Sequence, residues 1–497
     1  MASELFIGVD LGAESGRVMS GAFDGNQMTL TEHHRFATGG TWLGDSMHWD
    51  VLNFWKQIQT GLGHAARFSK DHSQPIKSIG VDTWGVDYVL LDANKRPMGF
   101  PFHYRDPRNE GMVEQLISRI PRSKIYEQTG IQFMDINTLC QLFAANQEGS
   151  LDEALRFLMM PDYFNWCLTG TEVGEFTIAT TSQCYDPATG DWARPLLQKL
   201  EIPTEMFPEI AHPGTNIGKV RSRVKELTGL TEDVDVILPG GHDTASAVAA
   251  IPVQPEFKNN WAYISSGTWS LVGLELPKPV LTEAALAANV TNEGGVAGTW
   301  RLLKNVVGLW LIQQLKSSLK MAGTDMDYQQ LTDAAEQAAP FRTLVDVDDA
   351  ELLKPQNIFP TIETICKRTG EPMPESPGAF ARCLLESLAF KYRCVIESLQ
   401  QIADYKVKVI HIVGGGSKNR LLNQFVAEAC AMPVVGGPVE ATFLGNVLVQ
   451  CKSNGEAGSL EEMREIVRNS FPLDTFEPRQ SQLWNDNFAR FKNLSNG

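Results

Sequence analysis

The stretch Phe6-Ile-Gly-Val-Asp-Leu-Gly-Ala-Glu-Ser-Gly-Arg-Val18 opens the chain with a predicted strand, a turn and a second strand. The apolar run ends in Asp10, and the turn that follows consists of small residues: Gly12, Ala13, Ser15 and Gly16. Small residues let backbone N–H groups approach an anion, Arg17 adds a positive charge, and Asp10 could hold a hydrated divalent cation. The pattern fits a phosphate-binding turn, and it equally fits an ordinary β-hairpin.

Length and composition indicate a large globular protein. The chain has 497 residues, 43% of them hydrophobic and 21% charged, which predicts two large domains or three small ones. The formal net charge of −16 argues against a broad electrostatic surface for nucleic acid or an anionic membrane. Any nucleotide site is therefore expected to be local.

Cysteine spacing argues against a structural zinc or iron–sulfur site, because no Cys-x-x-Cys pair occurs. Most cysteines are expected in the core, and whether Cys366 and Cys383 pair is left open. The sequence shows no secretory signal and no apolar run of about 18 residues. We therefore expect a cytoplasmic protein with no membrane partner.

A second stretch, Ser78 to Leu91, is predicted as strand, turn and strand. Its turn combines carboxylates, a hydroxyl and an aromatic ring, a mixture that is typical of polyol and sugar pockets: Asp82, Thr83, Trp84 and Asp87. The alternative is a hairpin with one buried tryptophan and solvated aspartates.

A third stretch, Val234 to Ala250, is predicted as a strand, a Gly-Gly turn and a helix of small residues. His242 and Asp243 lie where the helix begins. Asp243 could cap that helix, since aspartate is a preferred N-cap residue. It could equally be a base facing a cleft at the end of a strand.

The chain repeats its opening pattern after residue 260. Ile251 to Asn260 contains two prolines and no periodicity, so we predict a linker there, with lobes at 1–250 and 251–497. Tyr263 to Gly273 then again reads strand, small-residue turn and strand. A duplicated architecture follows from this repeat of pattern.

Two later stretches bear on a nucleotide site. Lys304 to Gln313 is predicted as the start of a helix, with Asn305 in its first turn. Val409 to Asn423 is predicted as a buried strand, a triple-glycine turn and a helix, where backbone N–H groups can attract an anion. Val434 to Leu448 resembles the next strand–turn–helix unit of the same sheet.

Taken in order, these stretches resemble the FGGY family of carbohydrate kinases, and within it most closely the kinases that act on L-rhamnulose. The resemblance covers nearly the whole chain and is carried by these segments: Asp10–Arg17, Asp82–Asp87, Met160–Phe164, His242–Ala247, Ser265–Ser270, Asn292–Gly295, Lys304–Asn305, Gly308–Trp310, Gly414–Gly416 and Gly437–Ala441. The wider family often has a lysine before the Asp-Tyr pair, and Met160-Pro-Asp-Tyr-Phe164 lacks it. The broad-family role of that segment is therefore not transferred.

The resemblance implies an α/β fold of two actin-like (ribonuclease H-like) lobes, with ATP and Mg²⁺ in an interdomain nucleotide cleft and the sugar on the first lobe. Asp243 would be the general base and Asp10 would help hold Mg²⁺ through water. Residues implied at the nucleotide are Ala13, Glu14, Ser15, Gly16, Arg17, Thr268, Gln313 and Gly415. Residues implied at the sugar are Gly85, His242, Thr244 and Asn305.

The implied reaction is ATP-dependent phosphorylation of L-rhamnulose to L-rhamnulose 1-phosphate. Phosphoryl transfer needs alignment, charge neutralisation and a positioned base, and the motifs contain residues for all three. A kinase for L-fuculose or another ketose is the closest alternative, because a few pocket residues can change the accepted hydroxyl orientation. A non-enzymatic actin-like ATP-binding protein is a more distant alternative. The oligomeric state does not follow from the sequence.

Overall fold

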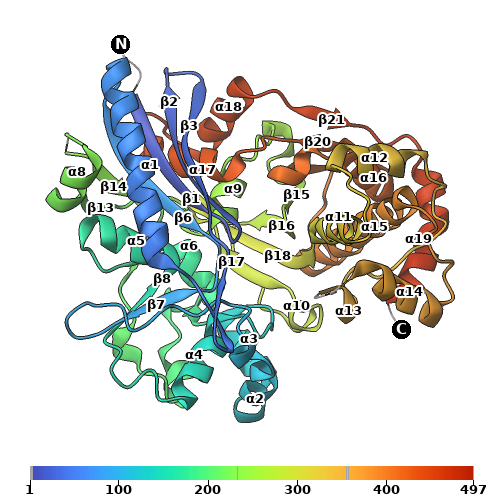
Figure 1. The fold of residues 1–497 in the computed structure, drawn as a ribbon, viewed down its shortest axis with the longest axis horizontal. Helices are drawn as coiled ribbons and strands as arrows, with labels where there is room; N and C mark the ends of the chain where they lie inside the picture. The colour runs from blue at the N-terminus through green and yellow to red at the C-terminus, as the bar shows by residue number, and fades with distance from the viewer. Residues whose placement is uncertain (1–3, 232, 354, 356, 496–497) are drawn as a thin grey trace. The chain divides into compact units, whose positions relative to one another are not determined.

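The opening stretch forms two antiparallel strands, β1 (Glu4–Leu11) and β2 (Ser15–Phe23), at the centre of a six-stranded sheet (Figure 1). The computed structural model describes residues 4–231, 233–353, 355 and 357–495. The first sheet has the order β13-β14-β6-β1-β2-β3. Its other strands are β3 (Met28–Ala37), β6 (Ile76–Thr83), β13 (Asn216–Lys219) and β14 (Asp235–Ile237).

Strand β1 is buried on both faces, and its successive side chains point alternately into two different cores. Leu5, Ile7, Val9 and Leu11 share one core with apolar residues of α1 (Val51–His72). Phe6 lies on the opposite face, in a second core with Phe443 and Val447 of α17 (Ala441–Ser453). Because side chains alternate along a strand, Gly8 and Asp10 lie on the face of Phe6.

Close approach of α17 explains the glycines in this sheet. A Cβ added at Gly8 would lie 2.4 Å from the Phe443 ring, and one at Gly80 would lie 2.6 Å from Oδ1 of Asn446. The side chain of Gln450 donates to the Ile7 carbonyl at 3.0 Å and accepts from Ser78 Oγ at 2.7 Å. Polar side chains of α17 therefore form hydrogen bonds with backbone and side-chain groups of β1 and β6.

Six strands of the second sheet repeat the strand order of the first, and β17 is an additional strand at one edge. It runs β17-β18-β16-β15-β19-β20-β21, and β15 pairs antiparallel with β16 and parallel with β19. At the far edge β20 pairs with β21 antiparallel, as β14 does with β13. Its strands are β15 (Trp261–Ser266), β16 (Trp269–Leu276), β17 (Thr291–Gly294), β18 (Trp300–Val307), β19 (Val409–Val413), β20 (Val434–Gly436) and β21 (Asp474–Phe476).

The chain divides into two compact units that exchange segments. Unit 1 is residues 1–252, 275–302 and 441–471, and unit 2 is residues 253–274, 303–440 and 472–497. The first division falls inside the predicted linker at 251–260. As functional lobes, 1–250 and 251–497 stay a prediction.

Helices and two-stranded sheets complete each unit. Unit 1 has α2 (Met112–Arg119), α3 (Arg122–Thr129), α4 (Thr138–Gln147), α5 (Met160–Thr169), α6 (Phe176–Ala179), α7 (Arg194–Lys199), α8 (Ser222–Thr228), α9 (Asp243–Ala249), α10 (Glu283–Ala287) and α18 (Leu460–Ser470). It also has the strand pairs β4 (Thr41–Leu43) with β5 (Ser46–His48), β7 (Tyr88–Leu91) with β8 (Arg156–Met159), β9 (Gly174–Glu175) with β12 (Ile210–Ala211), and β10 (Tyr185–Asp186) with β11 (Asp191–Trp192). Unit 2 has α11 (Trp310–Met321), α12 (Tyr328–Gln337), α13 (Ala350–Leu353), α14 (Ile358–Thr369), α15 (Pro377–Ala403), α16 (Arg420–Cys430) and α19 (Ser481–Ser495).

The helix predicted over Lys304 to Gln313 is wrong at its start. Lys304 and Asn305 lie in strand β18, and the helix begins only at Trp310. The apolar residues Val306 and Val307 fit either period in a short window, and pairing within the second sheet decides in favour of a strand.

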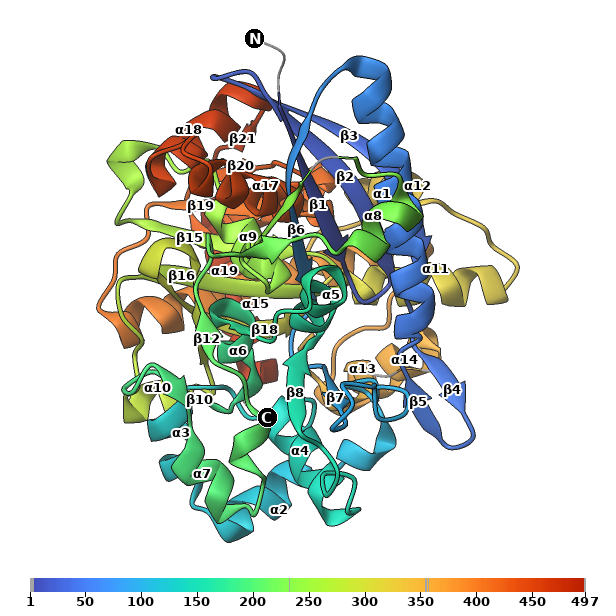
Figure 2. The ribbon, with the colours of Figure 1, turned by 90° about the vertical axis from the view of Figure 1, so that its left-hand side faces the viewer.

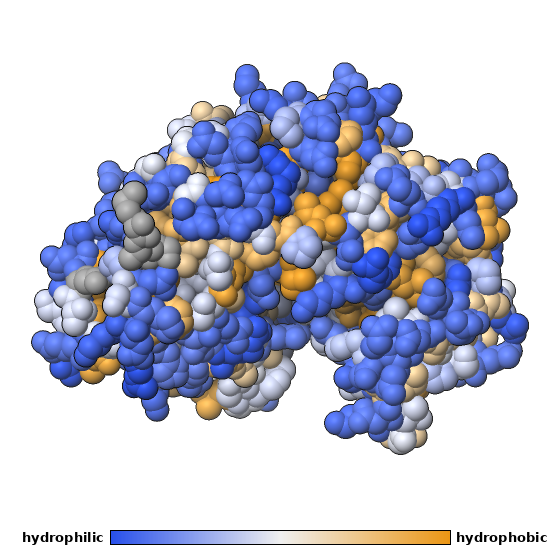
Figure 3. Space-filling view, turned by 90° about the horizontal axis from the view of Figure 1, so that it is seen from above, coloured by the Kyte–Doolittle hydropathy of each residue, from blue (hydrophilic) through white to orange (hydrophobic). Residues whose placement is uncertain are grey.

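The surface and the cysteines can be compared with what the composition predicts. Hydrophilic residues cover most of the face drawn in Figure 3, and no helix in the described ranges is long and apolar enough to span a membrane. All eight cysteines are free thiols, including Cys366 and Cys383, and both of these are buried.

We predict that Gly445→Ala destabilises unit 1 by about 1–3 kcal/mol or more, because overpacking cannot be relieved at this position. Helices α9 and α17 pack together (Figure 2), and a Cβ on Gly445 would lie 1.7 Å from the Ser246 carbonyl oxygen. Urea denaturation should show a lower midpoint than for the wild type.

Gly63→Ala is the matched control, since Gly63 also lies inside a helix of unit 1. A Cβ there would have its nearest neighbour at 3.5 Å, so the substitution should stabilise the helix by about 0.5–1 kcal/mol. Equal midpoints for the two variants would contradict the packing that we describe.

Candidate active site

Three aspartates lie where neighbouring parallel strands of unit 1 end. Asp10 of β1 and Asp82 of β6 are register partners, so their Cα atoms lie side by side. The chain leaving β14 continues along the same edge, because Thr83 pairs with His242 and its N–H donates to the Gly241 carbonyl at 2.9 Å. Asp243 follows directly. The carboxyl ends of adjacent strands are the usual place for a site in a sheet of this kind.

The predicted phosphate turn is a tight connection between β1 and β2. The Gly12 N–H donates to the Ser15 carbonyl at 3.0 Å, and Thr38 Oγ1 donates to the Gly12 carbonyl at 2.6 Å. Glu14 at the tip is exposed, Ala13 and Ser15 are half-buried, and Gly16 is buried. Arg17 forms an ion pair with Asp10, which is its register partner across the hairpin.

Asp82 is fully buried beside the other two aspartates, and its pKa is raised. Asn446 donates to its Oδ2 at 2.6 Å, and within the described residues its buried Oδ1 has no hydrogen-bond partner. Burial raises the pKa of Asp82 well above its usual range, and the charges of Asp10 and Asp243 raise it further. Electrostatic interaction among the three carboxyl groups therefore marks this edge as one acidic site.

These carboxylates fit a hydrated Mg²⁺ ion. Mg²⁺ prefers oxygen ligands and keeps several waters, so one or two protein carboxylates suffice. Asp10 and the unpartnered Oδ1 of Asp82 supply such oxygens at this edge. A site in which the protein supplies most of the metal ligands is not found: across the part of the chain that the structure describes, no group of three or more His, Cys, Asp or Glu residues could hold a metal.

The Gly-Gly turn before Asp243 is held by one buried carboxylate. Glu175 accepts from the Gly241 N–H at 2.9 Å and also from Thr177 and Ile178. A Cβ at Gly241 would lie 2.7 Å from Oε2 of Glu175, and one at Gly240 would lie 2.9 Å from the Ser246 nitrogen. Both glycines are required by this close approach.

Asp243 is the first residue of α9, and its N-cap is His242. The alternative in which Asp243 caps the helix is therefore wrong. Its side chain is 30% exposed, and Oδ1 accepts from Thr244 Oγ1 at 3.0 Å. Burial raises the pKa of Asp243, and the nearby Asp10 adds to the increase, whereas His242 lowers it. A half-buried carboxylate with a raised pKa has the properties of a general base.

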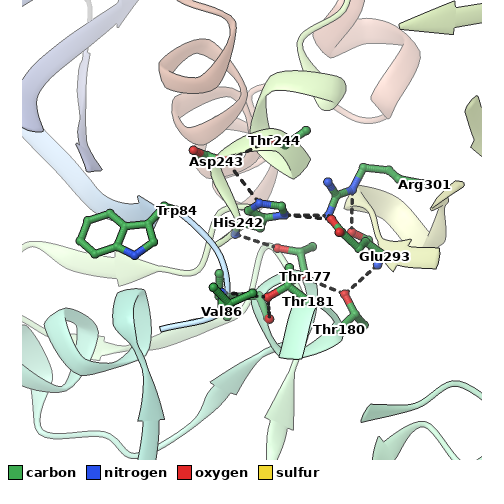
Figure 4. A network of polar contacts seen from close by, with 12 residues as sticks. Trp84, Val86, Thr177, Thr180, Thr181, His242, Asp243, Thr244, Glu293 and Arg301 are labelled. Carbon is green, nitrogen blue, oxygen red and sulfur yellow. Dashed lines mark hydrogen bonds and ion pairs between the residues drawn. The ribbon is translucent and has the colours of Figure 1, made fainter. Parts of the chain in front are cut away.

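Three of the predicted sugar residues lie together around this carboxylate (Figure 4). Nε2 of His242 lies 3.4 Å from Oδ1 of Asp243 and would lie 3.4 Å from a Cβ added at Gly85. Thr244 is next in the chain. Beside Gly85, Val86 has a φ of 69°, an unfavourable conformation for a β-branched residue, and Thr138 Oγ1 donates to its carbonyl at 2.6 Å.

Asp87 and Trp84 of the second stretch have a different role from the sugar contacts that the sequence predicts. Asp87 is fully buried, and its Oδ2 accepts from the indole nitrogens of Trp49 at 2.6 Å and Trp84 at 2.8 Å. Gln141 donates to Oδ1 at 3.0 Å. Asp87 is thus neither a sugar ligand nor a solvated surface residue, and it fixes two indoles whose ring centroids are 4.1 Å apart and whose planes are tilted by 34°.

Unit 2 brings together three of the predicted nucleotide residues. Nε2 of Gln313 lies 3.5 Å from Oγ1 of Thr268, and the Trp310 N–H donates to the Thr268 carbonyl at 3.1 Å. The glycine turn containing Gly415 packs on Ser266, because a Cβ at Gly416 would lie 2.0 Å from Ser266 Oγ. Gly415 itself is exposed. Asn305 lies on β18 in the same unit.

Comparison with known proteins identifies the family. The profile of the FGGY family of carbohydrate kinases matches with its N-terminal domain at residues 5–250 and with its C-terminal domain at residues 262–453. The chain belongs to the FGGY family of carbohydrate kinases. This confirms the family resemblance and the assignment as a sugar kinase.

Relatives of this FGGY kinase match along their whole length. It is 41% identical over 490 residues to a rhamnulokinase from Bacteroides thetaiotaomicron, covering 98% of this chain and 99% of the relative. It is 37% identical over 475 residues to a rhamnulokinase from Bacillus subtilis, covering 96% of each.

Solved structures of FGGY kinases share the fold. The ligand-bound xylulose kinase from Lactobacillus acidophilus has a TM-score of 0.81 at 16% identity, with 99% of this chain and 98% of that chain covered. The Plasmodium falciparum glycerol kinase with ADP has a TM-score of 0.79 at 16% identity, with the same coverage. The predicted α/β fold with two actin-like units is confirmed.

Sequence reasoning missed three buried charged residues of this FGGY kinase: Glu175, Glu293 and Arg301. Glu293 and Arg301 form an ion pair of 3.1 Å, and Oε2 of Glu293 also lies 3.1 Å from Nδ1 of His242. Glu293 is part of the Asn292–Gly295 segment that contributed to the family resemblance, which was the one available signal. Nothing in the sequence indicates which residues Glu293 contacts.

We predict that Asp87 makes the protein less stable as the pH rises from about 4 to about 7. Burial raises the pKa of Asp87 to about 7 from 3.8, although hydrogen bonds from Trp84, Gln141 and Trp49 lower it. The folded protein therefore binds this proton more tightly than the unfolded chain does, and that stabilisation is present below the unfolded pKa and lost as pH rises through the folded one.

Urea denaturation of the wild type and Asp87→Asn at several pH values tests this. The difference in free energy of unfolding, wild type minus variant, should decrease from pH 4 to pH 7.5 on top of a constant offset. Asp24→Asn is the control, because Asp24 is exposed and backbone N–H groups of Gln27 and Asn26 lower its pKa. A difference for Asp87→Asn that grows with pH would contradict the prediction.

Proposed function

We propose that this FGGY kinase transfers the γ-phosphoryl group of ATP to the terminal hydroxyl of L-rhamnulose, giving L-rhamnulose 1-phosphate in the breakdown of L-rhamnose. The observation that supports this most is the full-length match to rhamnulokinases, at 41% identity over 490 residues. The acidic net charge of −16 accords with a small-molecule substrate and with no nucleic-acid or membrane partner. We place the reaction in the cytoplasm.

In this proposal Asp243 is the general base. Its half-buried carboxylate has a raised pKa, which suits a group that must accept a proton from a sugar hydroxyl as the phosphoryl group arrives. Gly85, His242 and Thr244 lie around it and would contact the sugar. Asn305 is a further proposed sugar contact.

The nucleotide would be bound by backbone groups and small side chains. The turn from Ala13 to Arg17 would contact the phosphates, together with Thr268, and Gln313 and Gly415 would contact the nucleotide in unit 2. Backbone N–H groups and an arginine in such turns supply fixed positive charge for a polyphosphate. Exclusion of water from the bound substrates would limit ATP hydrolysis.

Asp10 would hold Mg²⁺ through water. When bound, the ion would neutralise charge on the phosphates of ATP. The ion pair with Arg17 holds the carboxylate of Asp10 close to the phosphate turn.

Phosphorylation assays with a ketose panel test this function. We expect ATP-to-ADP conversion with Mg²⁺ to be stimulated most by L-rhamnulose. Asp243→Asn should lower kcat by about 10²–10⁴-fold without a lower melting temperature, because it removes the base and keeps the shape. A clear preference for L-fuculose or a pentulose would reassign the substrate, and an active Asp243→Asn variant would reassign the base.

A second prediction concerns the metal. Activity should be lost on removal of Mg²⁺ with EDTA and restored on its return. Asp10→Asn should raise the Mg²⁺ concentration for half-maximal activity by about 10–100-fold, because a ligand that orients metal-bound water is lost. Asp24→Asn changes an exposed aspartate of the β2–β3 turn and should leave this concentration unchanged. Equal Mg²⁺ dependence for the two variants would show that Asp10 does not hold the ion.

A further inference from the structure

A buried charged pair lies behind His242, on the side away from Asp243 (Figure 4). Arg301 on β18 is fully buried, and Glu293 on β17 is nearly so, with side chains 0% and 7% exposed. Nε of Arg301 donates to the Gly294 carbonyl at 3.0 Å, which anchors the guanidinium to the end of β17. All of these residues belong to unit 1.

The imidazole of His242 has a different neighbour at each nitrogen. Nη2 of Arg301 lies 3.2 Å from Nδ1, and Oδ1 of Asp243 lies 3.4 Å from Nε2. A guanidinium can only donate, so the bond from Arg301 requires a lone pair on Nδ1. A carboxylate can only accept, so the contact with Asp243 requires a proton on Nε2.

One neutral tautomer satisfies both contacts. With the proton on Nε2, Arg301 donates to Nδ1, Nε2–H points at Asp243, and Glu293 keeps its ion pair with Arg301. The other tautomer would donate to Oε2 of Glu293, 3.1 Å from Nδ1, but it would lose the Arg301 bond and set a lone pair against Asp243. Burial acts to raise the pKa of Glu293, but the charge of Arg301 and the hydrogen bond and charge of His242 together lower it, so Glu293 pairs with the guanidinium as a carboxylate.

We propose that Arg301 and Glu293 are positioning residues that fix His242 in the tautomer with its proton on Nε2 and thereby orient the carboxylate of Asp243. In the described part of the chain, the side-chain contacts of Asp243 from His242 and Thr244 both go to Oδ1. Oδ2 is then the oxygen that accepts the proton of the sugar hydroxyl. This step rests on the proposed role of Asp243 as the base.

Long-range ¹H–¹⁵N NMR of the imidazole groups in the wild type tests the tautomer directly. The signals of His242 are identified by their loss in His242→Asn. We expect Nε2 to carry the proton, and a proton on Nδ1 alone would overturn the proposal. This measurement needs no substrate, so it stands even where L-rhamnulose proves not to be the ketose.

Arg301→Met removes the donor to Nδ1 and leaves Glu293 beside that nitrogen. The proton should move to Nδ1 in the NMR spectrum. With the best ketose of the panel, kcat should fall by about 100-fold while KM changes much less, since the base loses its orientation. Arg301→Lys keeps a charged donor and should recover most of the kcat.

Arg464→Met is the matched control. Arg464 is also a buried arginine of unit 1, paired with Glu275 at 2.8 Å, with side chains 7% and 10% exposed. It should lower the melting temperature in a similar way and leave kcat close to the wild-type value. Equal kcat for Arg301→Met and Arg464→Met would reduce Arg301 to a structural residue. Should Arg301→Met fail to fold, Arg301→Lys and the wild-type tautomer decide.

No turnover of any ketose by the wild type would contradict the proposed function and leave the tautomer to be judged by NMR. Turnover of L-rhamnulose by a wild type whose His242 carries its proton on Nδ1 would support the function and overturn the positioning role. The two proposals therefore fail separately.

Discussion

The parallel pairing of β1 with β6 places Asp10 and Asp82 side by side, and the chemistry of unit 1 depends on that register. Two adjacent carboxylates repel each other, and in a buried site one of them holds its proton. Asp82 is the more buried of the two, which raises its pKa, and among the described residues Asn446 donates to it. Asp10 forms its ion pair with Arg17.

The approach of helix α17 to these two strands needs glycine at two positions. Helix α17 can place Asn446 beside Asp82 only if it lies close to the sheet, and a side chain at Gly8 or Gly80 would prevent this approach. The same helix lies against α9, where Gly445 meets the backbone of Ser246. A single helix thus sets the position of Asp82 and of the segment that follows Asp243.

Local patterns in the sequence were sufficient to predict part of the candidate site. Turn residues and apolar patterns predicted a strand end at Asp10, a turn at Asp82 and a helix start at Asp243, because these signals lie within a few residues. Lys304 and Asn305 were misassigned to a helix because β18 forms through pairing with distant strands. Glu175, Glu293 and Arg301 were missed for the same reason: each contacts residues far away in the sequence, such as Gly241 and His242.

Buried charge is used in two ways around His242 and Asp243. Glu175 accepts four hydrogen bonds and holds the Gly-Gly turn, whereas Glu293 and Arg301 neutralise each other behind the imidazole. Burying an ion pair costs desolvation free energy that its attraction often fails to recover, so stability alone is a weak reason for its presence. Orientation of a neighbouring group is a better one, because the guanidinium geometry is fixed.

When β17 is left out, the two sheets have the same strand order, but the ends of their strands carry different chemistry. In unit 1 the ends of β1 and β6 and the segment after β14 carry Asp10, Asp82 and Asp243. The matching ends of β15, β19 and β20 in unit 2 carry Ser266, Gly414 and Gly436. Carboxylates at those positions would repel a polyphosphate, whereas small residues expose backbone N–H groups to it. The duplicated fold therefore separates the acidic groups, to which we assign a proton and a cation, from the uncharged turns, to which we assign an anionic nucleotide.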